Sequence, residues 1–292
     1  MKVLNMGSLN LDYVYSVAHM VREGETLAAD RMEVFCGGKG LNQSIALAKA
    51  GVEVFHAGLI GEDGEILLQA CHENGVNTEY IRKVPGKSGH TIIQVDRNAQ
   101  NCILLYGGSN RAFTKEYVEE VLGKFEPGDV ILLQNEINCL PEIVELADKK
   151  GMRIILNPSP MDKGLDEVDL SRISVFLVNE IEGAQLTGTE DVEEMLSVFR
   201  KKYPSASVVL TLGEKGAVYQ DGEQRIKQKA YPVRAVDTTA AGDTFTGYFI
   251  AGLLNHTEIT ERLKVCARAS AIAVSRKGAA ASIPSADEVG VR

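Results

Sequence analysis

The chain has 292 residues, of which 45% are hydrophobic, with 31 lysines and arginines against 40 aspartates and glutamates. This length and balance are typical of a globular protein with a sizeable core, and they exclude a disordered or fibrous chain. The formal net charge of −9 argues against nucleic acid or an anionic membrane surface as a partner, because such partners are bound by a cationic excess.

Neither a leader peptide nor a membrane span is expected. The N-terminus lacks a continuous apolar stretch followed by a small-residue cleavage site, and no run approaches the roughly 18 apolar residues that span a bilayer. We therefore expect a cytoplasmic protein. The cysteines are scattered without a C-x-x-C pair, so we expect neither a disulfide framework nor a zinc site. They are Cys36, Cys71, Cys102, Cys139 and Cys266.

Short apolar runs alternate with helical patterns along the chain. Runs rich in β-branched residues and without polar alternation are typical of strands buried on both faces. Such strands are expected at residues 52–60, 129–134, 152–156, 175–178 and 208–212. Helices are expected at residues 40–50, 64–74, 114–124, 141–150, 180–186, 192–201, 242–254 and 258–274. This order predicts an α/β fold, a three-layer α/β/α sandwich with a mostly parallel central sheet, as a single domain over residues 1–292.

Two segments interrupt this rhythm. Residues 13–35 show few helix signals, and residues 90–106 alternate polar and apolar on both sides of a polar turn at residues 97–101. The second pattern predicts a β-hairpin. Because so few strands do not fold independently, we expect both segments to form a small β lid over one edge of the main sheet.

A glycine cluster, Gly37-Gly38-Lys39-Gly40, leads into the first expected helix. Glycines let the backbone approach a ligand closely, and Lys39 and Asn42 can donate to hydroxyl or phosphate oxygens at a helix N-terminus. The segment matches neither the Walker A nor the G-x-G-x-x-G pattern. Taken alone, the cluster also fits a tight strand-to-helix turn with an exposed lysine.

Small residues precede the helix expected at residues 242–254. The backbone amides of Ala240, Ala241, Gly242 and Asp243 can form an anion hole for the charge that develops on a transferred phosphoryl group. Asp243, beside that hole, is suited to take a proton from an attacking hydroxyl. Taken alone, the run also fits a turn with an aspartate at the helix N-cap.

Asn10 and Asp12 follow the first apolar run, and we place them at the end of the first strand. Residues two apart on an extended chain project to the same side, so both side chains can meet one polyol. Taken alone, the pair favours a polar turn.

The two motifs, in this order and at this separation, resemble the ribokinase-like (PfkB) family of sugar kinases, and the likeness runs from Val3 to Pro284. Within the family, Asn42-Gln43 and residues 240–243 are similar to the ribokinase branch. The resemblance implies an ATP-dependent phosphotransferase with an alcohol group as acceptor, which converts D-ribose to ribose 5-phosphate. A family member acting on another sugar or a nucleoside, and a catalytically silent sugar-binding regulator, stay open as alternatives.

The resemblance also implies a role for each motif residue. Sugar hydroxyls would be held by Asn10, Asp12, Gly38, Lys39, Asn42, Glu136 and Asp243. Asp243 would be the base, beside an anion hole at Ala240, Ala241 and Gly242. ATP would lie against Asn179, Thr211, Gly213 and Gly216. Glu182 would organise Mg2+ through water, and a monovalent cation, K+, would be held by Asp237, Thr239, Gly278 and Ser282.

Two further expectations come from the resemblance. The lid strands of this family commonly pair between subunits, which implies a homodimer. Arg268 stands where relatives place small residues along the adenine pocket, so we expect it either to face solvent or to alter the base preference.

Overall fold

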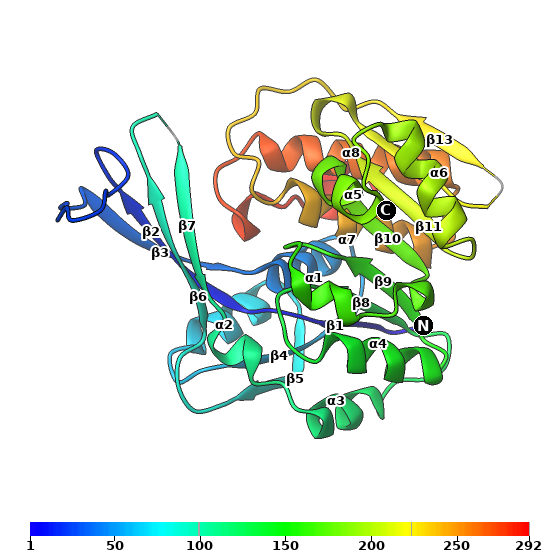
Figure 1. Ribbon diagram of the computed structural model, residues 1–292, viewed down its shortest axis with the longest axis horizontal. Coiled ribbons are helices and arrows are strands. Elements are labelled where there is room, and N and C mark those ends of the chain that lie inside the picture. Colours follow the sequence, from blue (N-terminus) through cyan, green and yellow to red (C-terminus); the bar gives the residue numbers. More distant parts are fainter. Residues whose placement is uncertain (99, 223, 292) are drawn as a thin grey trace.

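The computed structural model describes residues 1–98, 100–222 and 224–291, and a large twisted sheet is its central element (Figure 1). In the described chain this sheet has the strand order β13-β12-β11-β10-β9-β8-β1-β4-β5. The strands are β1 (Val3–Met6), β4 (Val54–Ile60), β5 (Asn77–Lys83), β8 (Val130–Gln134), β9 (Arg153–Asn157), β10 (Val175–Asn179), β11 (Ser207–Thr211), β12 (Ala217–Gln220) and β13 (Arg225–Gln228). The strands from β5 to β11 pair in parallel, whereas β12 and β13 add an antiparallel edge.

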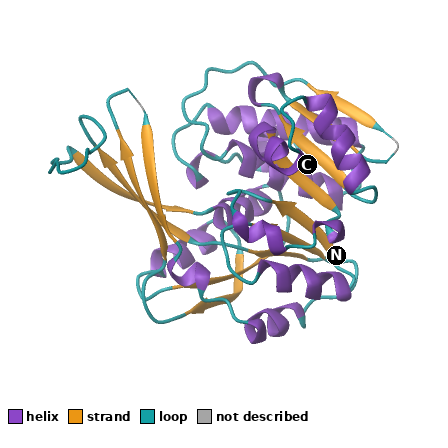
Figure 2. Ribbon diagram, viewed as in Figure 1, coloured by secondary structure: helices purple, strands orange, loops and turns teal. Residues whose placement is uncertain are grey.

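Helices cover both faces of this sheet (Figure 2). One layer contains α3 (Lys115–Leu122), α4 (Leu140–Lys149), α5 (Glu180–Thr187) and α6 (Val192–Lys202). The other contains α1 (Lys39–Lys49), α2 (Glu65–Glu73), α7 (Ala241–Leu254), α8 (Ile259–Val274) and α9 (Ala286–Val289). Alternate residues of a strand reach opposite layers: Leu4 and Met6 belong to the first core, and Val3 belongs to the second.

The predicted α/β/α sandwich is thereby confirmed. The five buried strands and eight helices expected from the sequence are all present, with ends within two residues of the expected positions. The strands β5, β12 and β13 were not expected from the sequence. The strands β5 and β13 lie at the two ends of the large sheet and are partly exposed. The strand β12 lies next to β13 and is mostly buried, but it is only four residues long.

A second, smaller sheet projects from the side of the molecule (Figure 1). Its order is β3-β2-β6-β7, formed by β2 (Asn10–Ser16), β3 (Arg31–Gly37), β6 (Gly89–Val95) and β7 (Asn101–Tyr106). The hairpin predicted over residues 90–106 is present as β6 and β7, and Ala99 in its predicted turn lies outside the described residues. The segment 13–35 supplies most of β2 and β3.

The position expected for Asn10 and Asp12 needs a correction. The first strand, β1, ends at Met6, and both residues lie at the start of β2 in the small sheet. They are therefore neither at the end of the first strand nor in a polar turn. Their extended backbone is present as expected, so the two side chains share one face of the small sheet.

No helix in the described ranges is long and apolar enough to cross a membrane. All five cysteines are free thiols.

Candidate active site

The two motifs meet where α1 and α7 begin. Asn42 donates from Nδ2 to Oδ2 of Asp243 at 3.2 Å, and Gln43 donates from Nε2 to Oδ1 at 2.9 Å. Both carboxylate oxygens of Asp243 are thus held by amides of α1, although the residues are about 200 positions apart in the chain. Asp243 itself is buried in the first turn of α7.

Close packing of the two helices makes this contact possible. A Cβ atom at Gly247 of α7 would lie 2.5 Å from the Cβ of Ala46 in α1, which is closer than two carbon atoms can approach. The glycine therefore lets the helices touch backbone to backbone. As a result, the first turn of α7 lies within hydrogen-bond distance of the Asn42 and Gln43 amides.

The motif glycines set where α1 starts. Gly38 precedes the helix with a φ of +92°, which residues other than glycine rarely adopt. Gly40 packs so tightly that a Cβ there would lie 2.4 Å from the backbone nitrogen of Ser8. The helix N-terminus is thereby pressed against the segment that joins β1 to β2.

Lys39 and Glu136 form the charged part of the site. Oε2 of Glu136 accepts hydrogen bonds from the backbone N of Lys39 at 2.8 Å and from the Ser8 hydroxyl. Burial raises the pKa of Glu136, against the opposing effects of Ser8 and Lys39. Burial alone lowers the pKa of Lys39, but the carboxylates of Asp243, Glu136 and Glu182 give a net rise. The lysine is thus a fixed cation among three acidic groups.

The small sheet supplies the opposite wall through Asn10 and Asp12. Asn110 donates from Nδ2 to Oδ1 of Asn10 at 2.7 Å, and Thr91 donates its hydroxyl to Oδ1 of Asp12. Burial raises the pKa of Asp12 to about 6; the Thr91 bond opposes this rise, and the Glu136 charge adds to it. Neither Thr91 nor Asn110 was expected from the sequence. Thr91 reaches Asp12 through the parallel pairing of β2 with β6, and Asn110 reaches Asn10 from the turn that follows β7.

An apolar cleft of about 580 Å³ opens beside the first turn of α7. This volume lies within the range of small-molecule sites. The predicted nucleotide residues Thr211, Gly213 and Gly216 line it together with Ala241 and Gly242. A Cβ at Gly242 or at Gly213 would meet no atom within 4 Å, so the backbone there is open to a ligand. The cleft is completed by Tyr231, Pro232, Val233, Ala267 and Ala271.

Asn179 and Glu182 are not among the residues that line this cleft. They form a capping box at the start of α5, in which Asn179 Oδ1 accepts from the Glu182 N at 2.8 Å and Glu182 Oε2 accepts from the Asn179 N at 3.0 Å. Glu182 is buried, and its Oε1 accepts from Nδ2 of Asn179 at 3.0 Å. The two residues therefore stabilise the end of β10 and the start of α5.

The loop before α7 brings together three of the four residues predicted for a monovalent cation. Asp237 accepts from the Thr239 N and the Gly278 N, both at 3.0 Å. These bonds outweigh partial burial and lower the pKa of Asp237. Ser282 is buried four positions after Gly278, where its hydroxyl donates to the Ala279 carbonyl at 2.8 Å. In the described chain, no cluster of three or more His, Cys, Asp or Glu could hold a metal ion.

Arg268 packs between the C-terminal segment and Tyr231. Its Nη1 donates to the Val289 carbonyl at 2.9 Å, and its guanidinium lies 5.9 Å from the ring centre of Tyr231. The side chain is thus held against the C-terminal segment instead of simply facing solvent. It reaches the apolar cleft through Tyr231, which lines that cleft.

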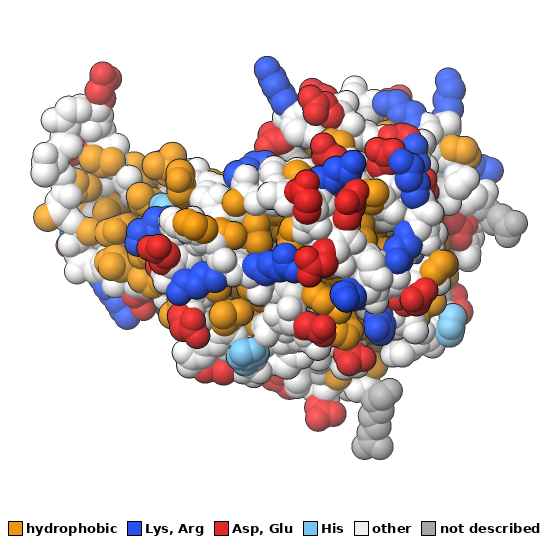
Figure 3. All heavy atoms as spheres, turned by 90° about the horizontal axis from the view of Figure 1, so that it is seen from below, with side chains coloured by type: hydrophobic (Ala, Val, Ile, Leu, Met, Phe, Trp, Pro, Cys, Tyr) orange, Lys and Arg blue, Asp and Glu red, His pale blue; other side chains and the backbone are white. Residues whose placement is uncertain are grey.

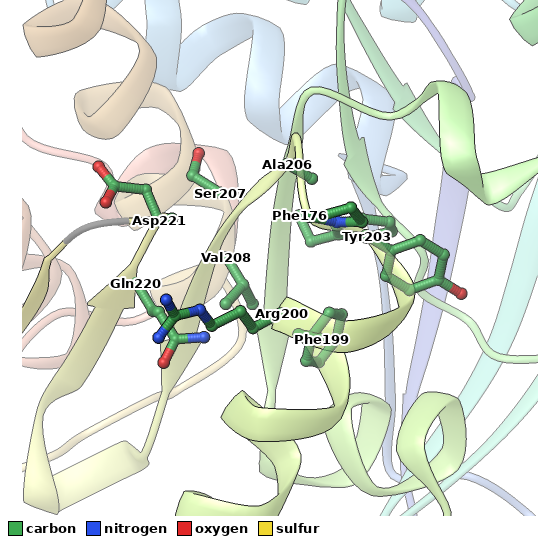
Figure 4. A pocket seen from close by; sticks show the side chains of 11 residues that line it. Phe176, Phe199, Arg200, Tyr203, Ala206, Ser207, Val208, Gln220 and Asp221 are labelled. Carbon is green, nitrogen blue, oxygen red and sulfur yellow. The ribbon is translucent and has the colours of Figure 1, made fainter.

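A second hollow lies between α6 and the strands β11 and β12 (Figure 4). Phe176, Phe199 and Tyr203 form its apolar side, and its volume is about 10 Å³. That space is about the size of one water molecule, which is too small for a sugar or a nucleotide. The polar pocket, which is the cluster of polar side chains around Asp243, and the adjoining cleft form the candidate active site. The cluster consists of Asn10, Asp12, Lys39, Asn42, Glu136 and Asp243.

Comparisons with known proteins agree with this geometry. A ribokinase from Haemophilus influenzae is 36% identical over 294 residues, covering 97% of this chain and 95% of the relative. A deoxyribokinase from Salmonella typhi is 30% identical over 297 residues, covering 99% and 97%. The structure of Arabidopsis thaliana ribokinase complexed with ribose and ATP matches with a TM-score of 0.88 at 31% identity, covering 99% and 97%. The model of the pfkB family of carbohydrate kinases matches residues 2–286, and the chain belongs to this family.

Proposed function

We propose that the protein is an ATP-dependent sugar kinase whose substrate is D-ribose and whose product is ribose 5-phosphate. One observation carries the proposal: Asp243 lies at the first turn of α7, between the polar pocket and the apolar cleft, with both carboxylate oxygens held by amides. Relatives named ribokinase and the ribose and ATP complex of the Arabidopsis protein support the choice of substrates.

The polar pocket has the chemistry of a sugar site. Asn10, Asp12, Asn42 and Glu136 offer amide and carboxylate groups, which pair with vicinal hydroxyls. Asn42 Oδ1 is buried without a partner in the described chain, which leaves one acceptor of the site unused. Lys39 is bordered by carboxylates, so it donates to a hydroxyl instead of binding a sugar phosphate. Gly38 keeps the backbone close to the sugar.

The chemical step is an in-line transfer. Asp243 takes the proton of the primary hydroxyl, whose oxygen forms a new bond to the γ-phosphorus of ATP. The bond from that phosphorus to the β,γ-bridging oxygen breaks, and ADP leaves with the electron pair. The backbone amides at residues 240–243 stabilise the charge on the transferring group. ATP lies in the apolar cleft, with Thr211, Gly213 and Gly216 along one side and Asn179 near the phosphates.

Two ions complete the proposal. Mg2+ binds mainly to phosphates and water, so the capped Glu182 carboxylate would act on it through a water molecule; the ion neutralises phosphate charge. K+ suits the loop of Asp237, Thr239, Gly278 and Ser282, because a carboxylate, hydroxyls and backbone carbonyls are ligands for a weakly hydrated cation. The Ser282 hydroxyl donates to Ala279, which leaves its oxygen lone pairs available. That cation would fix the loop before α7.

The small sheet is proposed as a lid and as the contact between two subunits. Leu105 of β7 pairs with Thr91 of β6, which pairs with Asp12 of β2, so these residues share one face of the small sheet. Leu104 pairs with Ile92 on the opposite face. Leu104 is 65% exposed, and Figure 3 shows hydrophobic side chains gathered at this end of the molecule. Because both faces of the small sheet carry apolar groups, one face can close over the sugar and the other can contact a second copy of the chain. Closure would exclude water from ATP.

The test is an ADP-release assay with Mg-ATP and K+. The sugars compared are D-ribose, 2-deoxyribose and fructose, with nucleosides as a further class. Ribose should give the highest kcat/KM. A preference for 2-deoxyribose would replace D-ribose as the proposed substrate, in line with the name of the Salmonella relative, and the proposed kinase chemistry would stand. Binding of sugar without any turnover would favour a regulator. We place the activity in the cytoplasm, where ATP is available.

Asp243→Asn tests the base directly. The amide keeps the shape of the side chain but cannot take a proton, so we expect kcat to fall by at least roughly 100-fold while sugar binding persists. Turnover is measured by ADP release and sugar binding by calorimetry. Undiminished turnover would refute the assignment of Asp243 as the base.

A further inference from the structure

Buried side-chain amides form a hydrogen-bonded network next to Asp243, and Gln43 is the member that joins this network to the Asp243 carboxylate. Gln43 has no exposed surface. Its Nε2 donates to Oδ1 of Asp243 and to Oδ1 of Asn157, each at 2.9 Å, and its Oε1 accepts from Nε2 of Gln134 at 2.6 Å. Every polar atom of the Gln43 side chain is therefore engaged.

Backbone carbonyls fix the direction of the hydrogen bonds in this network on one side. A carbonyl oxygen can only accept, so the Asn5 amide must turn its Nδ2 toward the Gly40 carbonyl, at 2.7 Å. Its Oδ1 then faces Gln134, which donates from Nε2 at 3.0 Å. The same Gln134 nitrogen donates to Gln43 Oε1, so the Gln43 amino group is left to face Asp243.

The Leu177 carbonyl, acting through Asn157, requires the same orientation of the Gln43 amide. Asn157 turns its Nδ2 toward the Leu177 carbonyl of β10, at 2.9 Å. Its Oδ1 is thereby left to accept from the Gln43 amino group. The two anchors belong to α1 and β10, so a flip of the Gln43 amide would break hydrogen bonds on both sides.

We infer that Gln43 is a positioning residue that holds the Asp243 carboxylate in place and aims it at the sugar hydroxyl. The inference rests on the proposed function, in which Asp243 is the base. A hydrogen bond from an amide to a carboxylate favours the charged form and fixes its direction. Asn42 holds the other oxygen but also faces the sugar pocket, whereas Gln43 contacts protein groups only.

Other charges also act on Asp243. Lys39 of α1 is a nearby cation, and Glu136, which follows β8, is a nearby carboxylate. Glu182 of α5 acts on Lys39 and is joined to Asn157 by a long hydrogen bond of 3.5 Å. The Gln43 side chain hydrogen-bonds to Asn157, Asp243 and Gln134 and not to these three groups, so we expect a change in the pH profile of a Gln43 variant to report the lost amide.

The test is Gln43→Met, which keeps the length of the side chain and removes both hydrogen-bonding groups. Because a bond to a charged group stabilises by about 1.5–3 kcal/mol, we expect kcat at neutral pH to fall roughly tenfold to a hundredfold. The acid limb of the kcat profile should move to higher pH by roughly one unit or more. KM for ribose and for ATP should stay within about threefold, because Gln43 lines neither the polar pocket nor the apolar cleft.

The matched control is Gln220→Met in β12. Gln220 is also buried, and its Nε2 donates to the Leu196 carbonyl at 2.7 Å, away from both motifs. This variant should keep the wild-type kcat and pH profile. A smaller fall in kcat with the same direction of pH change is expected for Gln134→Met, which also serves if the Gln43 variant does not fold.

Three results would overturn the inference. The first is a Gln43→Met enzyme with unchanged kcat and pH profile. The second is a Gln43→Met enzyme in which only KM for the sugar rises. The third applies if the Gln43 variant does not fold, and it is a folded Gln134→Met enzyme with unchanged kcat. An inactive Asp243→Asn enzyme beside a normal Gln43→Met enzyme would remove this inference alone. A fully active Asp243→Asn enzyme would instead remove the proposed base.

Discussion

Burial destabilises the carboxylate form of Asp12, and hydrogen bonds from a bound sugar can offset this effect. Its pKa is raised to about 6 because burial disfavours the carboxylate. Sugar hydroxyls that donate to the carboxylate stabilise the charged form, so binding should be weaker when Asp12 is protonated. We therefore expect the affinity for ribose to rise as the pH increases from 5 to 7. Calorimetry without ATP measures it.

The Asp12→Asn variant isolates this effect. Glu136 also has a raised pKa and acts in the same direction, so a residual pH dependence in the variant is assigned to Glu136. The variant should bind ribose more weakly at pH 7 and show a flatter pH dependence. A wild-type affinity that stays constant between pH 5 and 8 would contradict the prediction.

At the residue scale, the motifs identified the groups with the strongest chemistry. Lys39, Asn42 and Asp243 were predicted from local pattern, and the structure brings them together. Asn110 and Gln134 could not be predicted, because neither belongs to a recognised motif. Their partners, Asn10 and Gln43, come from segments about 90 to 100 positions away, so only the folded chain reveals them.

At the element scale, the contact between α1 and α7 is the feature on which the site depends. Gly247→Ala would place a Cβ 2.5 Å from Ala46, so the helices must separate. We expect the free energy of unfolding to fall by about 1–3 kcal/mol. The kcat should fall as well, because Asn42 and Gln43 move away from Asp243. Denaturant unfolding and ADP release measure the two effects.

Gly183→Ala in α5 is the control for this change. Its nearest atoms would be the Met195 sulfur at 3.0 Å and a Leu210 methyl at 3.1 Å, both at the ends of flexible side chains. That variant should keep its kcat and lose less stability. If Gly247→Ala matched it in both stability and kcat, close helix contact would not be what positions Asp243.

The elements themselves were predictable where burial is simple. The central strands are covered on both faces, so their apolar runs are continuous, and β4, β8 and β10 are each followed by a helical pattern. The strands β5 and β13 lie at the ends of the sheet with partly exposed residues, so their sequences lack that signal. Pairing within the small sheet joins distant segments, which no local pattern encodes.

At the scale of the whole molecule, the projecting sheet leaves apolar residues uncovered. Ile103, Leu104 and Tyr106 are each more than half exposed in β7. A stable dimer needs roughly 1,000 Å² or more of buried surface with an apolar centre, and a four-stranded sheet can supply it. We therefore expect the wild-type protein to have twice the mass of one chain by light scattering at micromolar concentration.

Leu104→Glu tests this contact, because a buried carboxylate at its centre costs more free energy than a weak interface provides. The variant should elute as a monomer while its thermal stability as a single chain persists. Ile181→Glu, in α5 and 70% exposed, is the control and should remain a dimer. If dimerisation also steadies the lid over the sugar, the monomeric variant should show a raised KM for ribose at a nearly unchanged KM for ATP. A wild-type protein that is monomeric throughout this concentration range would refute the lid contact, and the apolar face would then serve closure over the sugar alone.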